Sequence, residues 1–494
     1  MATMETHVPA QPTAHVDTFA RDHLPPPGLL PFIDYAGLPE LHYPPRLNCA
    51  VELLDRMAAA GHADRPAVVW DGGRWTYREL AETSDRIAAA LRDDLGLVPG
   101  NRVLLRGFNS PMMAACWFGV LKAGGIVVAT MPLLRARELA NVAEKARIAL
   151  ALTDHRLLGE MEEARGMAPV IQRIVSWGTD DEGSLDTMMR GKPAGFDAVD
   201  TAADDVALIA FTSGTTGKPK GAMHFHRDVL ACCDTFSQHV LQPGPDDLFC
   251  GSPPLAFTFG LGGLLLFPLR AGAATLLVEQ PTPPNLLKAV RDHRATILFT
   301  APVAYRAIPD LVPSFDISSL RKCVSAGETL PLPTFEAFER ATGIRIIDGI
   351  GSTEMLHIFI ASSGDDIRPG STGKAVPGYR ARVIDDEGKP LPPGSIGRLA
   401  VQGPTGCRYL DDEERQRGYV LDGWNLTGDA YRMDEDGYFW YQARTDDMII
   451  SAGYNIAGPE VEQALLAHRD VAECAVIGAP DAERGHIVKA FVVL

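Results

Sequence analysis

The segment that most constrains the fold of this chain is residues 211–221, a run rich in glycine, hydroxyl and lysine side chains that directly follows an apolar stretch at residues 206–210. The apolar stretch is typical of a buried strand. The glycines of the loop allow backbone N–H groups to approach an anion without interference from Cβ atoms. The sequence therefore predicts a buried strand that ends in a loop for a polyphosphate.

The spacing of this loop separates it from a P-loop. A P-loop has four residues between its first glycine and its Gly-Lys pair. Here only two residues separate Gly214 from Gly217-Lys218. The sequence therefore disfavours a Walker-type NTPase, although the hydroxyl and lysine side chains still complete an anion site.

Helical patterns alternate with short apolar runs on both sides of the loop, which predicts an α/β fold with layered sheets. Helices are expected at residues 77–93, 111–123, 135–146, 227–240 and 284–293. Strands are expected at residues 102–105, 126–129, 148–152, 275–278, 297–300 and 323–325. Beyond residue 372, short strands at 381–384 and 398–402 are separated by Gly and Pro, which favours a small β-barrel-like subdomain.

A chain of 494 residues is longer than one hydrophobic core normally serves, so we expect several domains. Residues 1–45 are rich in Pro and His and predict an extended N-terminal strap. Residues 46–445 predict a large domain of two layered α/β subdomains, in which residues 373–445 form the β-rich part. Residues 446–494 predict the first part of a small α+β C-terminal domain. Its expected elements are a helix at 458–468 and strands at 474–477 and 488–493.

The net charge and the composition restrict which binding partners and which cellular compartment we expect. The formal net charge is -17, whereas nucleic-acid-binding proteins carry basic patches, so we expect no nucleic-acid partner. The longest lysine-free apolar stretch, residues 261–269, is about half of a membrane span, so we expect no membrane insertion. The 8 cysteines have no CxxC spacing, which is typical of reduced thiols in a cytoplasmic protein.

Further motifs follow the loop in a fixed order. They are Pro253 to Gly260, Gly349-Ile350-Gly351-Ser352-Thr353-Glu354, Thr427-Gly428-Asp429, and Arg444-Thr445-Asp446-Asp447 followed by Gly453 and Pro459-Glu460. Together with the loop they resemble the signatures of the adenylate-forming superfamily, which comprises acyl- and aryl-CoA synthetases, adenylation domains of peptide synthetases, and beetle luciferases. Residues 348–359 are similar to the benzoate-CoA and 2-aminobenzoate-CoA ligase branch, and the resemblance covers residues 45–494.

This resemblance implies an ATP-dependent aryl-acid CoA ligase that activates a carboxylate as acyl-AMP and transfers the acyl group to CoA. Residues 46–445 would then be the AMP-binding domain. Catalytic roles would fall to Lys220, Glu354, Arg444 and Thr216, with Mg²⁺ on Glu354, because a carboxylate suits a hard cation that keeps some of its waters. The implied nucleotide-binding residues are Thr212, Ser213, Gly214, Thr215, Gly217, Gly327, Glu328, Thr329, Asp348, Gly349, Ile350, Thr353, Asp429 and Tyr441.

The implied acid pocket combines apolar side chains with two small polar groups, and such a slot suits an aromatic acid. Its expected residues are Phe257, Thr258, Phe259, Gly351, His357 and Ile358. We expect Thr258 or His357 to bind an ortho substituent of the acid. Asp446 would be the hinge of the C-terminal domain. Ser451, Gly453 and Tyr454 are the candidates for contacts to CoA.

Two alternatives to the aryl-acid ligase stay open. The first is a medium-chain acyl-CoA ligase with a deeper tunnel. The second is an adenylation-impaired remnant that binds AMP or an acyl-adenylate, because members of the family usually continue further and carry a lysine in their terminal segment. The expected partners are small molecules, namely a carboxylic acid, ATP and CoA, and a homodimer is one possible assembly.

Two other features are not assigned to chemistry. His224 and His226 lie two residues apart, but no Cys or carboxylate partner stands at metal-ligand spacing, so we expect them to line the exit of the loop. Residues 260–263 are rich in glycine, but the third glycine of a dinucleotide-binding fingerprint would fall at Leu265. The sequence therefore predicts neither a histidine metal site nor a Rossmann turn.

Overall fold

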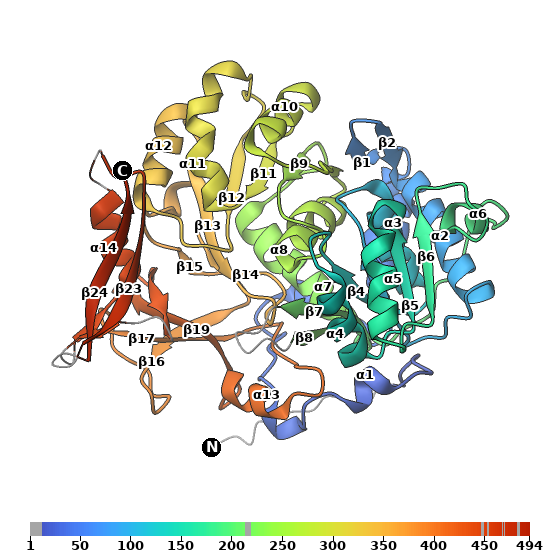
Figure 1. The fold of residues 1–494 in the computed structure, drawn as a ribbon, viewed down its shortest axis with the longest axis horizontal. Coiled ribbons are helices and arrows are strands. Elements are labelled where there is room, and N and C mark those ends of the chain that lie inside the picture. The colour runs from blue at the N-terminus through green and yellow to red at the C-terminus, as the bar shows by residue number, and fades with distance from the viewer. Residues whose placement is uncertain are drawn as a thin grey trace.

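The fold is given by a computed structural model that describes residues 12–212, 219–445, 449–451, 454–466, 468, 470–481 and 485–494 (Figure 1). The described strands form four sheets, with six, nine, five and four strands. The two large sheets are mostly parallel and carry helices, whereas the two smaller sheets are antiparallel. This arrangement confirms the predicted mixed α/β architecture.

The six-stranded sheet contains the strand that leads into the loop. Its order is β6 (Arg173–Trp177), β5 (Leu150–Asp154), β3 (Arg102–Arg106), β4 (Ile126–Thr130), β7 (Val206–Thr212) and β8 (Lys220–Phe225). All neighbours are parallel except β7 and β8. Every residue of β3 and β5 is buried, as expected for parallel strands covered on both faces. The predicted strand before the loop is therefore confirmed.

Of the helices in the first half of the chain, α3 (Pro111–Lys122) and α5 (Leu158–Met167) pack on strands of this sheet. The helix α2 (Tyr77–Asp93) packs against α3, and α4 (Ala136–Ala146) packs against α5. A capping box between Thr76 and Glu79 begins α2, and Ser110 caps α3, whose first residue is a proline. The three predicted helices in this region are confirmed to within a residue or two.

The nine-stranded sheet carries the later motifs. Its order is β15 (Lys374–Ala375), β14 (Ile358–Ala361), β13 (Ile346–Gly351), β12 (Lys322–Ser325), β11 (Ile297–Thr300), β9 (Leu248–Gly251), β10 (Ala274–Leu276), β1 (Pro66–Trp70) and β2 (Gly73–Thr76). Its helices include α10 (Pro283–His293), α11 (Pro302–Leu311) and α12 (Leu332–Thr342). The helix predicted at residues 227–240 is an α-helix, α7 (His226–Cys232), that continues as a π-helix over Cys233–Leu241.

The predicted β-rich subdomain is present, and its strands form an open antiparallel sheet with no closed barrel among the described residues. Its strands are β16 (Arg380–Ile384), β17 (Ile396–Gln402), β19 (Trp424–Met433), β18 (Val420–Leu421) and β20 (Phe439–Arg444). Two strands pair with the same edge of the ten-residue β19. Its first part pairs with β18, and its second part pairs with β20. A closed barrel needs one continuous circuit of paired strands, and this branching interrupts the circuit.

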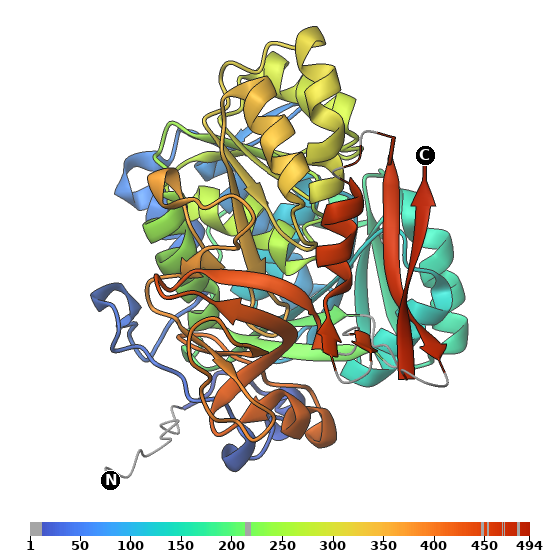
Figure 2. The same ribbon diagram turned by 90° about the vertical axis from the view of Figure 1, so that its left-hand side faces the viewer.

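The last described residues form a small sheet with one helix. The strand order is β22 (Tyr454–Ile456), β21 (Ile449–Ser451), β24 (Gly485–Val493) and β23 (Glu473–Asp481). The helix α14 (Gly458–Leu466) packs on β23 and also contacts α12 and β20, as the red and orange elements of Figure 2 show. Arg306 of α11 forms an ion pair of 2.8 Å with Glu473 of β23.

The N-terminal segment runs along the outside of the other units. After the short helix α1 (Phe19–Asp22) it has little regular structure and is held by backbone bonds, including Phe32 N–H to Gly423 O at 2.9 Å and Asp34 N–H to Gly403 O at 3.0 Å. Asp17 accepts from the buried Arg102 at 2.5 Å. Within the described part of the chain, each helix is too short or too polar to cross a lipid bilayer.

Candidate active site

Two clefts open where the carboxyl ends of the parallel strands of both large sheets come together. One has a volume of about 800 Å³ and is lined mainly by apolar side chains; we call it the apolar cleft. The other has a volume of about 910 Å³ and contains most of the charged motif residues; we call it the polar cleft. Gly327, Glu328, Gly351 and Ser352 line both clefts, so a ligand in one can reach a ligand in the other.

The apolar cleft contains all of the residues predicted for the acid pocket, which are Phe257, Thr258, Phe259, Gly351, His357 and Ile358. Thr258 and Phe259 begin the short helix α8 (Thr258–Leu261), whereas His357 and Ile358 come from the turn into β14. Phe257 is 42% exposed at the cleft, while His357 is almost fully buried. The cleft therefore has an open aromatic rim and a closed end that contains an imidazole.

The imidazole of His357 is neutral and has an unused ring nitrogen. Burial lowers its pKa to about 3. Nε2 lies 3.4 Å from the carbonyl oxygen of Phe259, and Nδ1 has no hydrogen-bond partner. The rings of Phe267, Phe236 and Phe259 surround it at centroid distances of 4.5, 5.6 and 5.8 Å. This end of the cleft therefore contains one neutral, buried polar side chain within an aromatic wall.

Two glycines are required for His357 to lie there. A Cβ atom on Gly262 would be 2.2 Å from Cδ2 of His357, and a Cβ atom on Gly351 would be 2.7 Å from its carbonyl carbon. Either contact would push the imidazole or its backbone out of place. Gly262, which the sequence analysis considered only as part of a dinucleotide turn, therefore has a packing function.

The polar cleft brings Lys220 and Glu354 together from different sheets. Lys220 begins β8, where it pairs in register with Thr212 of β7, and Glu354 follows β13. The hydroxyl of Tyr409 donates to Oε1 of Glu354 at 2.5 Å. Burial, followed by the charge of Glu354, raises the pKa of Tyr409, so the hydroxyl keeps the proton that it donates. Tyr409 could not be predicted as a site residue from the sequence, because no neighbouring residue in the chain marks it as part of a motif.

Glu354 is suited to hold Mg²⁺ with help from the substrate. Its Oε2 is not used by Tyr409, and among the residues that the structure describes there is no cluster of three or more His, Cys, Asp or Glu side chains for a metal ion. A protein that supplies one carboxylate fits Mg²⁺, which keeps several waters and takes its remaining ligands from phosphate oxygens.

Asp429 and Arg444 face each other across β19 and β20, where they pair in register. Nη1 of Arg444 donates to Oδ1 of Asp429 at 2.9 Å and to the carbonyl oxygen of Thr427 at 3.2 Å. Burial raises the pKa of Asp429, and Arg444 opposes this shift. The side chain of Asp429 is 10% exposed and that of Arg444 is 50% exposed. The pair therefore presents a carboxylate and a guanidinium at one edge of the polar cleft.

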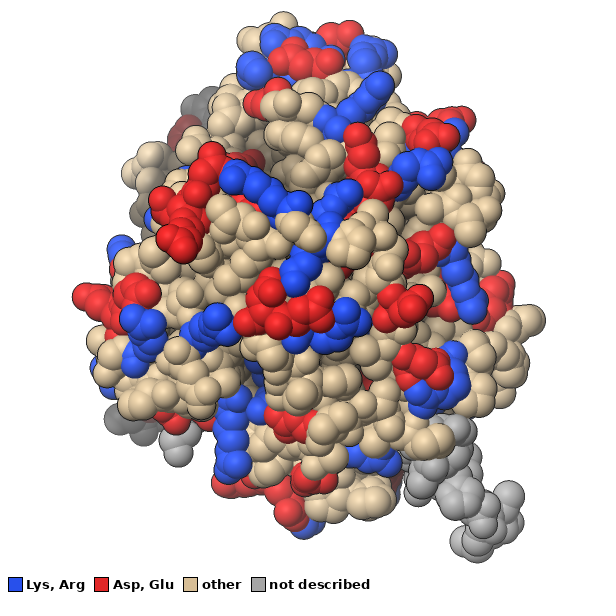
Figure 3. Space-filling view, turned by 90° about the vertical axis from the view of Figure 1, so that its right-hand side faces the viewer, with Lys and Arg blue, Asp and Glu red and all other residues tan. Residues whose placement is uncertain are grey.

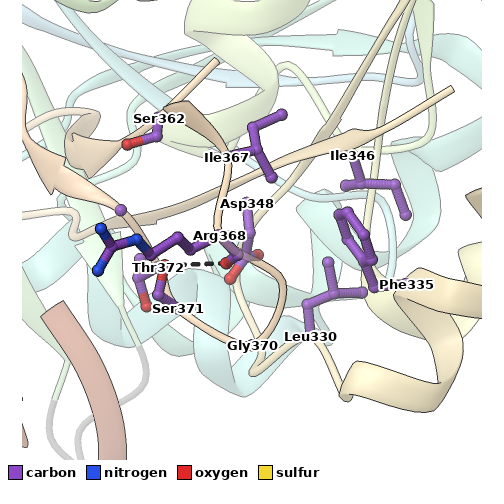
Figure 4. Close-up of a pocket in the computed structure, with 11 residues that line it drawn as sticks. Leu330, Phe335, Ile346, Asp348, Ser362, Ile367, Arg368, Gly370, Ser371 and Thr372 are labelled. Atoms are coloured by element: carbon purple, nitrogen blue, oxygen red, sulfur yellow. Dashed lines mark hydrogen bonds between the residues drawn. The ribbon is translucent and has the colours of Figure 1, made fainter. Parts of the chain in front are cut away.

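Asp348 lies within β13, where it pairs in register with Ser325 at the end of β12, and it borders the polar cleft. Its Oδ1 is buried without a hydrogen-bond partner, and burial raises its pKa to about 7. Its side chain borders a small cavity of about 10 Å³, close to the minimum volume for one water molecule. Figure 4 shows the residues that line this cavity. Ser371, on the opposite side of this cavity, donates from its hydroxyl to the carbonyl oxygen of Arg368 at 2.9 Å.

The other predicted site residues are distributed as follows. Thr329, Gly349, Ile350 and Tyr441 line the polar cleft, Thr212 and Thr353 line the apolar cleft, and Gly327 and Glu328 line both. Ser451 and Tyr454 pair with each other in the β21–β22 hairpin. Ser213, Gly214, Thr215, Thr216, Gly217, Asp446 and Gly453 lie outside the described residues.

The expectation that His224 and His226 line the exit of the loop is wrong, because both are completely buried. Nε2 of His224 lies 2.8 Å from the carbonyl oxygen of Thr353, and Nδ1 of His226 accepts from the backbone N–H of Cys49 at 3.1 Å. Burial lowers their pKa values to about 4 and about 3. Both imidazoles are neutral parts of the core.

The outer surface contrasts with the clefts. On the face shown in Figure 3, acidic and basic side chains are interspersed over the whole area. Many surface charges form ion pairs, such as Arg156 with Glu279 at 2.8 Å. No extended patch of one sign forms on that face.

Comparisons with known proteins agree with this arrangement. The model of the AMP-binding enzyme family matches residues 55–408, and the model of the AMP-binding enzyme C-terminal domain matches residues 460–494. The chain is 34% identical to a benzoate–CoA ligase of Thauera aromatica, over 92% of this chain and 88% of that protein.

Two crystal structures are also similar. The anthranilate CoA ligase AuaEII in complex with anthranoyl-AMP has a TM-score of 0.88 and 35% identity, and the match covers 92% of this chain and 88% of that one. A benzoate CoA ligase from Burkholderia xenovorans LB400 has a TM-score of 0.82 and 30% identity, with 90% and 89% covered.

Proposed function

Because this chain belongs to the AMP-binding enzyme family, we propose that it is an ATP-dependent aryl-acid CoA ligase of the benzoate or 2-aminobenzoate type. The single observation that carries the proposal is the junction of the two clefts at Gly351 and Ser352. An aromatic acid in the apolar cleft would direct its carboxylate toward the junction. The α-phosphate of a nucleotide in the polar cleft would meet the carboxylate there.

The proposed reaction has two steps. A carboxylate oxygen attacks the α-phosphorus of ATP, the bond between that phosphorus and the bridging oxygen breaks, and pyrophosphate leaves. The sulfur of CoA, having lost its proton, then attacks the carbonyl carbon, and AMP leaves with one oxygen of the acid. Both steps depend on alignment and charge neutralisation more than on a covalent intermediate with the protein.

The residues of the polar cleft supply the neutralisation in this proposal. Lys220 contributes a positive charge next to the phosphates, together with the loop residues Thr212, Ser213, Gly214, Thr215, Thr216 and Gly217. Glu354 would hold Mg²⁺, which would neutralise phosphate oxygens. Asp429 would accept from the ribose hydroxyls, and Arg444 would approach the same sugar or the α-phosphate. Thr353 would lie beside Glu354 at the cation, and Gly327, Glu328, Thr329, Asp348, Gly349, Ile350 and Tyr441 would surround the base and the sugar.

The apolar cleft supports an aryl acid over a simple polar acid. Its lining from Phe257, Phe259 and Ile358 removes apolar ring surface from water. Nδ1 of the neutral His357 offers one hydrogen bond to a ring substituent, which suits 2-aminobenzoate or a hydroxylated benzoate. The identity of 34% to a benzoate–CoA ligase and of 35% to an anthranilate CoA ligase also supports an aryl acid as the substrate.

We further propose a division into domains and a site for CoA. The strap at residues 1–45, the domain at 46–445 and the C-terminal unit at 446–494 follow the changes of sheet along the chain. Asp446 would be the hinge between the last two units. Ser451, Gly453 and Tyr454 would contact CoA, since they belong to the unit that moves.

The test is a mass-spectrometric assay of acyl-AMP and acyl-CoA with benzoate, 2-aminobenzoate and octanoate as competing acids. The proposal expects AMP-forming thioester synthesis with the two aryl acids, and a much lower kcat/KM with octanoate. Preferred use of octanoate would contradict the aryl assignment, and thioester formation with release of ADP would contradict the reaction.

A further inference from the structure

Glu354 is held by a side chain that the proposed reaction does not otherwise use. The hydroxyl of Tyr409 donates to its Oε1 at 2.5 Å, and Tyr409 is only 2% exposed although it borders the polar cleft. A hydrogen bond from a neutral donor to a carboxylate is stronger than one between neutral groups. Tyr409 therefore restricts the rotation of a carboxylate that would otherwise move freely at the cleft surface.

The backbone of Tyr409 is fixed to the strand that carries Lys220. Residues 408–410 run antiparallel to β8, with Leu410 N–H bonded to Gly221 O and Met223 N–H bonded to Arg408 O, both at 2.8 Å. Lys220 is the residue next to Gly221. Tyr409 therefore connects β8 of the six-stranded sheet, which begins at Lys220, to Glu354, which follows β13 of the nine-stranded sheet.

A buried glutamine fixes Tyr409 from the other side. Oε1 of Gln416 accepts from the backbone N–H of Tyr409 at 2.9 Å. Nε2 of Gln416 donates to the carbonyl oxygen of Cys407 and to that of Leu29 in the N-terminal strap, both at 3.0 Å. All polar groups of this fully buried amide are therefore used, and the strap is connected to the position of Tyr409.

A second bond holds the peptide next to Glu354. The neutral His224 donates from Nε2 to the carbonyl oxygen of Thr353 at 2.8 Å. Asp228 accepts from the buried Arg408 at 2.7 Å and caps α7 by accepting from the N–H of Phe225 at 2.9 Å. Both the backbone and the side chain of the Glu354 segment are therefore attached to β8 and α7.

We infer that Tyr409 is a positioning residue, which fixes the Glu354 carboxylate relative to Lys220 so that a divalent cation and the nucleotide phosphates bind in register. The inference depends on the proposed function for the identity of the nucleotide. Its physical basis is that an error of about 1 Å in the position of a reacting group can reduce a rate by about 100-fold. A tyrosine with a purely structural role would affect stability and leave the cation requirement unchanged.

The experiment replaces Tyr409 by phenylalanine, which removes the donor and keeps the ring that packs edge-on against Tyr419. Mn²⁺ is titrated by calorimetry into the full chain saturated with α,β-methylene-ATP, a nucleotide whose bridge between the α- and β-phosphates cannot be cleaved. We expect Mn²⁺ affinity to fall about tenfold, as for the loss of one hydrogen bond to a charged group. Binding of AMP without metal should stay within about twofold, a change of under 1 kcal/mol.

The matched control is Tyr77→Phe. Its hydroxyl is equally buried and donates to Ala273 O at 2.7 Å, but it lies outside both clefts. We expect this variant to lose a similar amount of thermal stability and to keep its Mn²⁺ affinity. A Gln416→Leu variant, which leaves the Tyr409 hydroxyl in place but frees its backbone, should weaken Mn²⁺ binding by a smaller factor.

Unchanged or tighter Mn²⁺ binding in Tyr409→Phe would overturn the inference, as would equal weakening in Tyr77→Phe. If Tyr409→Phe does not fold, the Gln416→Leu titration decides by the same criterion. Failure of the proposed function has a different signature, because the wild type would then form no thioester from any acid while the Mn²⁺ titrations could still differ between variants.

Discussion

The two clefts share the wall formed by Gly327, Glu328, Gly351 and Ser352, but they differ in the polarity and charge of their other side chains. The apolar cleft ends in aromatic rings and an imidazole whose pKa burial lowers to about 3, so its polar end carries no charge at neutral pH. The polar cleft contains Lys220, Glu354 and the Asp429–Arg444 pair, which carry charge. This difference indicates that the acid is chosen by shape and desolvation, whereas the nucleotide is held by charge.

The largest effect should come from the polar cleft. We expect Glu354→Gln to reduce the rate of acyl-AMP formation by about 100- to 1000-fold, the range for loss of one electrostatic stabiliser in an active site. The amide keeps the shape of the side chain but removes the charge that would hold the cation. Rapid-quench measurement of acyl-AMP checks it, with the exposed Glu473→Gln as a control. A loss below tenfold would place the cation elsewhere.

Asp429→Ala should have the next largest effect, on the affinity for AMP. Removal of a carboxylate that accepts hydrogen bonds from a sugar weakens binding by about 10- to 100-fold. Calorimetric titration with AMP gives the affinity directly, and Asp292→Ala, which changes an exposed ion pair with Arg291, serves as the control. Equal affinity in wild type and Asp429→Ala would mean that the ribose lies away from β19 and β20.

In the apolar cleft the effect should be smaller and should depend on the acid. His357→Ala opens space between Phe236, Phe259 and Phe267, so KM for benzoate should rise about tenfold through lost packing. Acids with a larger ring substituent should lose less or should improve. Steady-state kinetics with a series of substituted benzoates checks it, and a uniform change of KM across the series would contradict the assignment of His357 to the acid.

The carboxyl of Asp348 should affect the pH dependence of stability and not the choice of ligand. Because burial raises its pKa to about 7, the folded protein holds a proton that the unfolded chain releases near pH 4. The stability of the folded state should therefore decrease as pH rises from about 4 to about 7. Asp348→Asn should remove about 2 kcal/mol of this decrease, measured by urea unfolding at pH 5 and pH 8. Parallel pH profiles for wild type and variant would contradict it.

Motifs with strong local chemistry were predictable from the sequence, and contacts between distant segments were not. Apolar runs such as residues 206–210 and 297–300 predicted buried strands, because parallel strands covered on both faces are apolar throughout. The open sheet at β19 depends on which partner each half of one strand chooses, and short strands separated by Gly and Pro do not encode that choice.

The same limit applies to the site. Lys220, Glu354 and Asp429 stand in recognisable motifs, whereas Tyr409 gains its position only from the pairing of residues 408–410 with β8. His224 and His226 were wrongly expected to line the exit of the loop. Both are completely buried in the fold. Burial of a polar residue depends on tertiary partners such as the carbonyl oxygen of Thr353, which lies far away in the chain.

In the proposed reaction, the carboxylate of the acid attacks the α-phosphorus of ATP where the two clefts join. Transfer of an oxygen isotope from the acid to AMP is the most direct measurement of this attack. Benzoate labelled with ¹⁸O in both carboxylate oxygens is incubated with ATP, Mg²⁺, CoA and the protein, and the nucleotide products are analysed by mass spectrometry. If the carboxylate attacks the α-phosphorus, AMP will carry one ¹⁸O atom and pyrophosphate will carry none. Unlabelled AMP, or ADP with the label in inorganic phosphate, would contradict it.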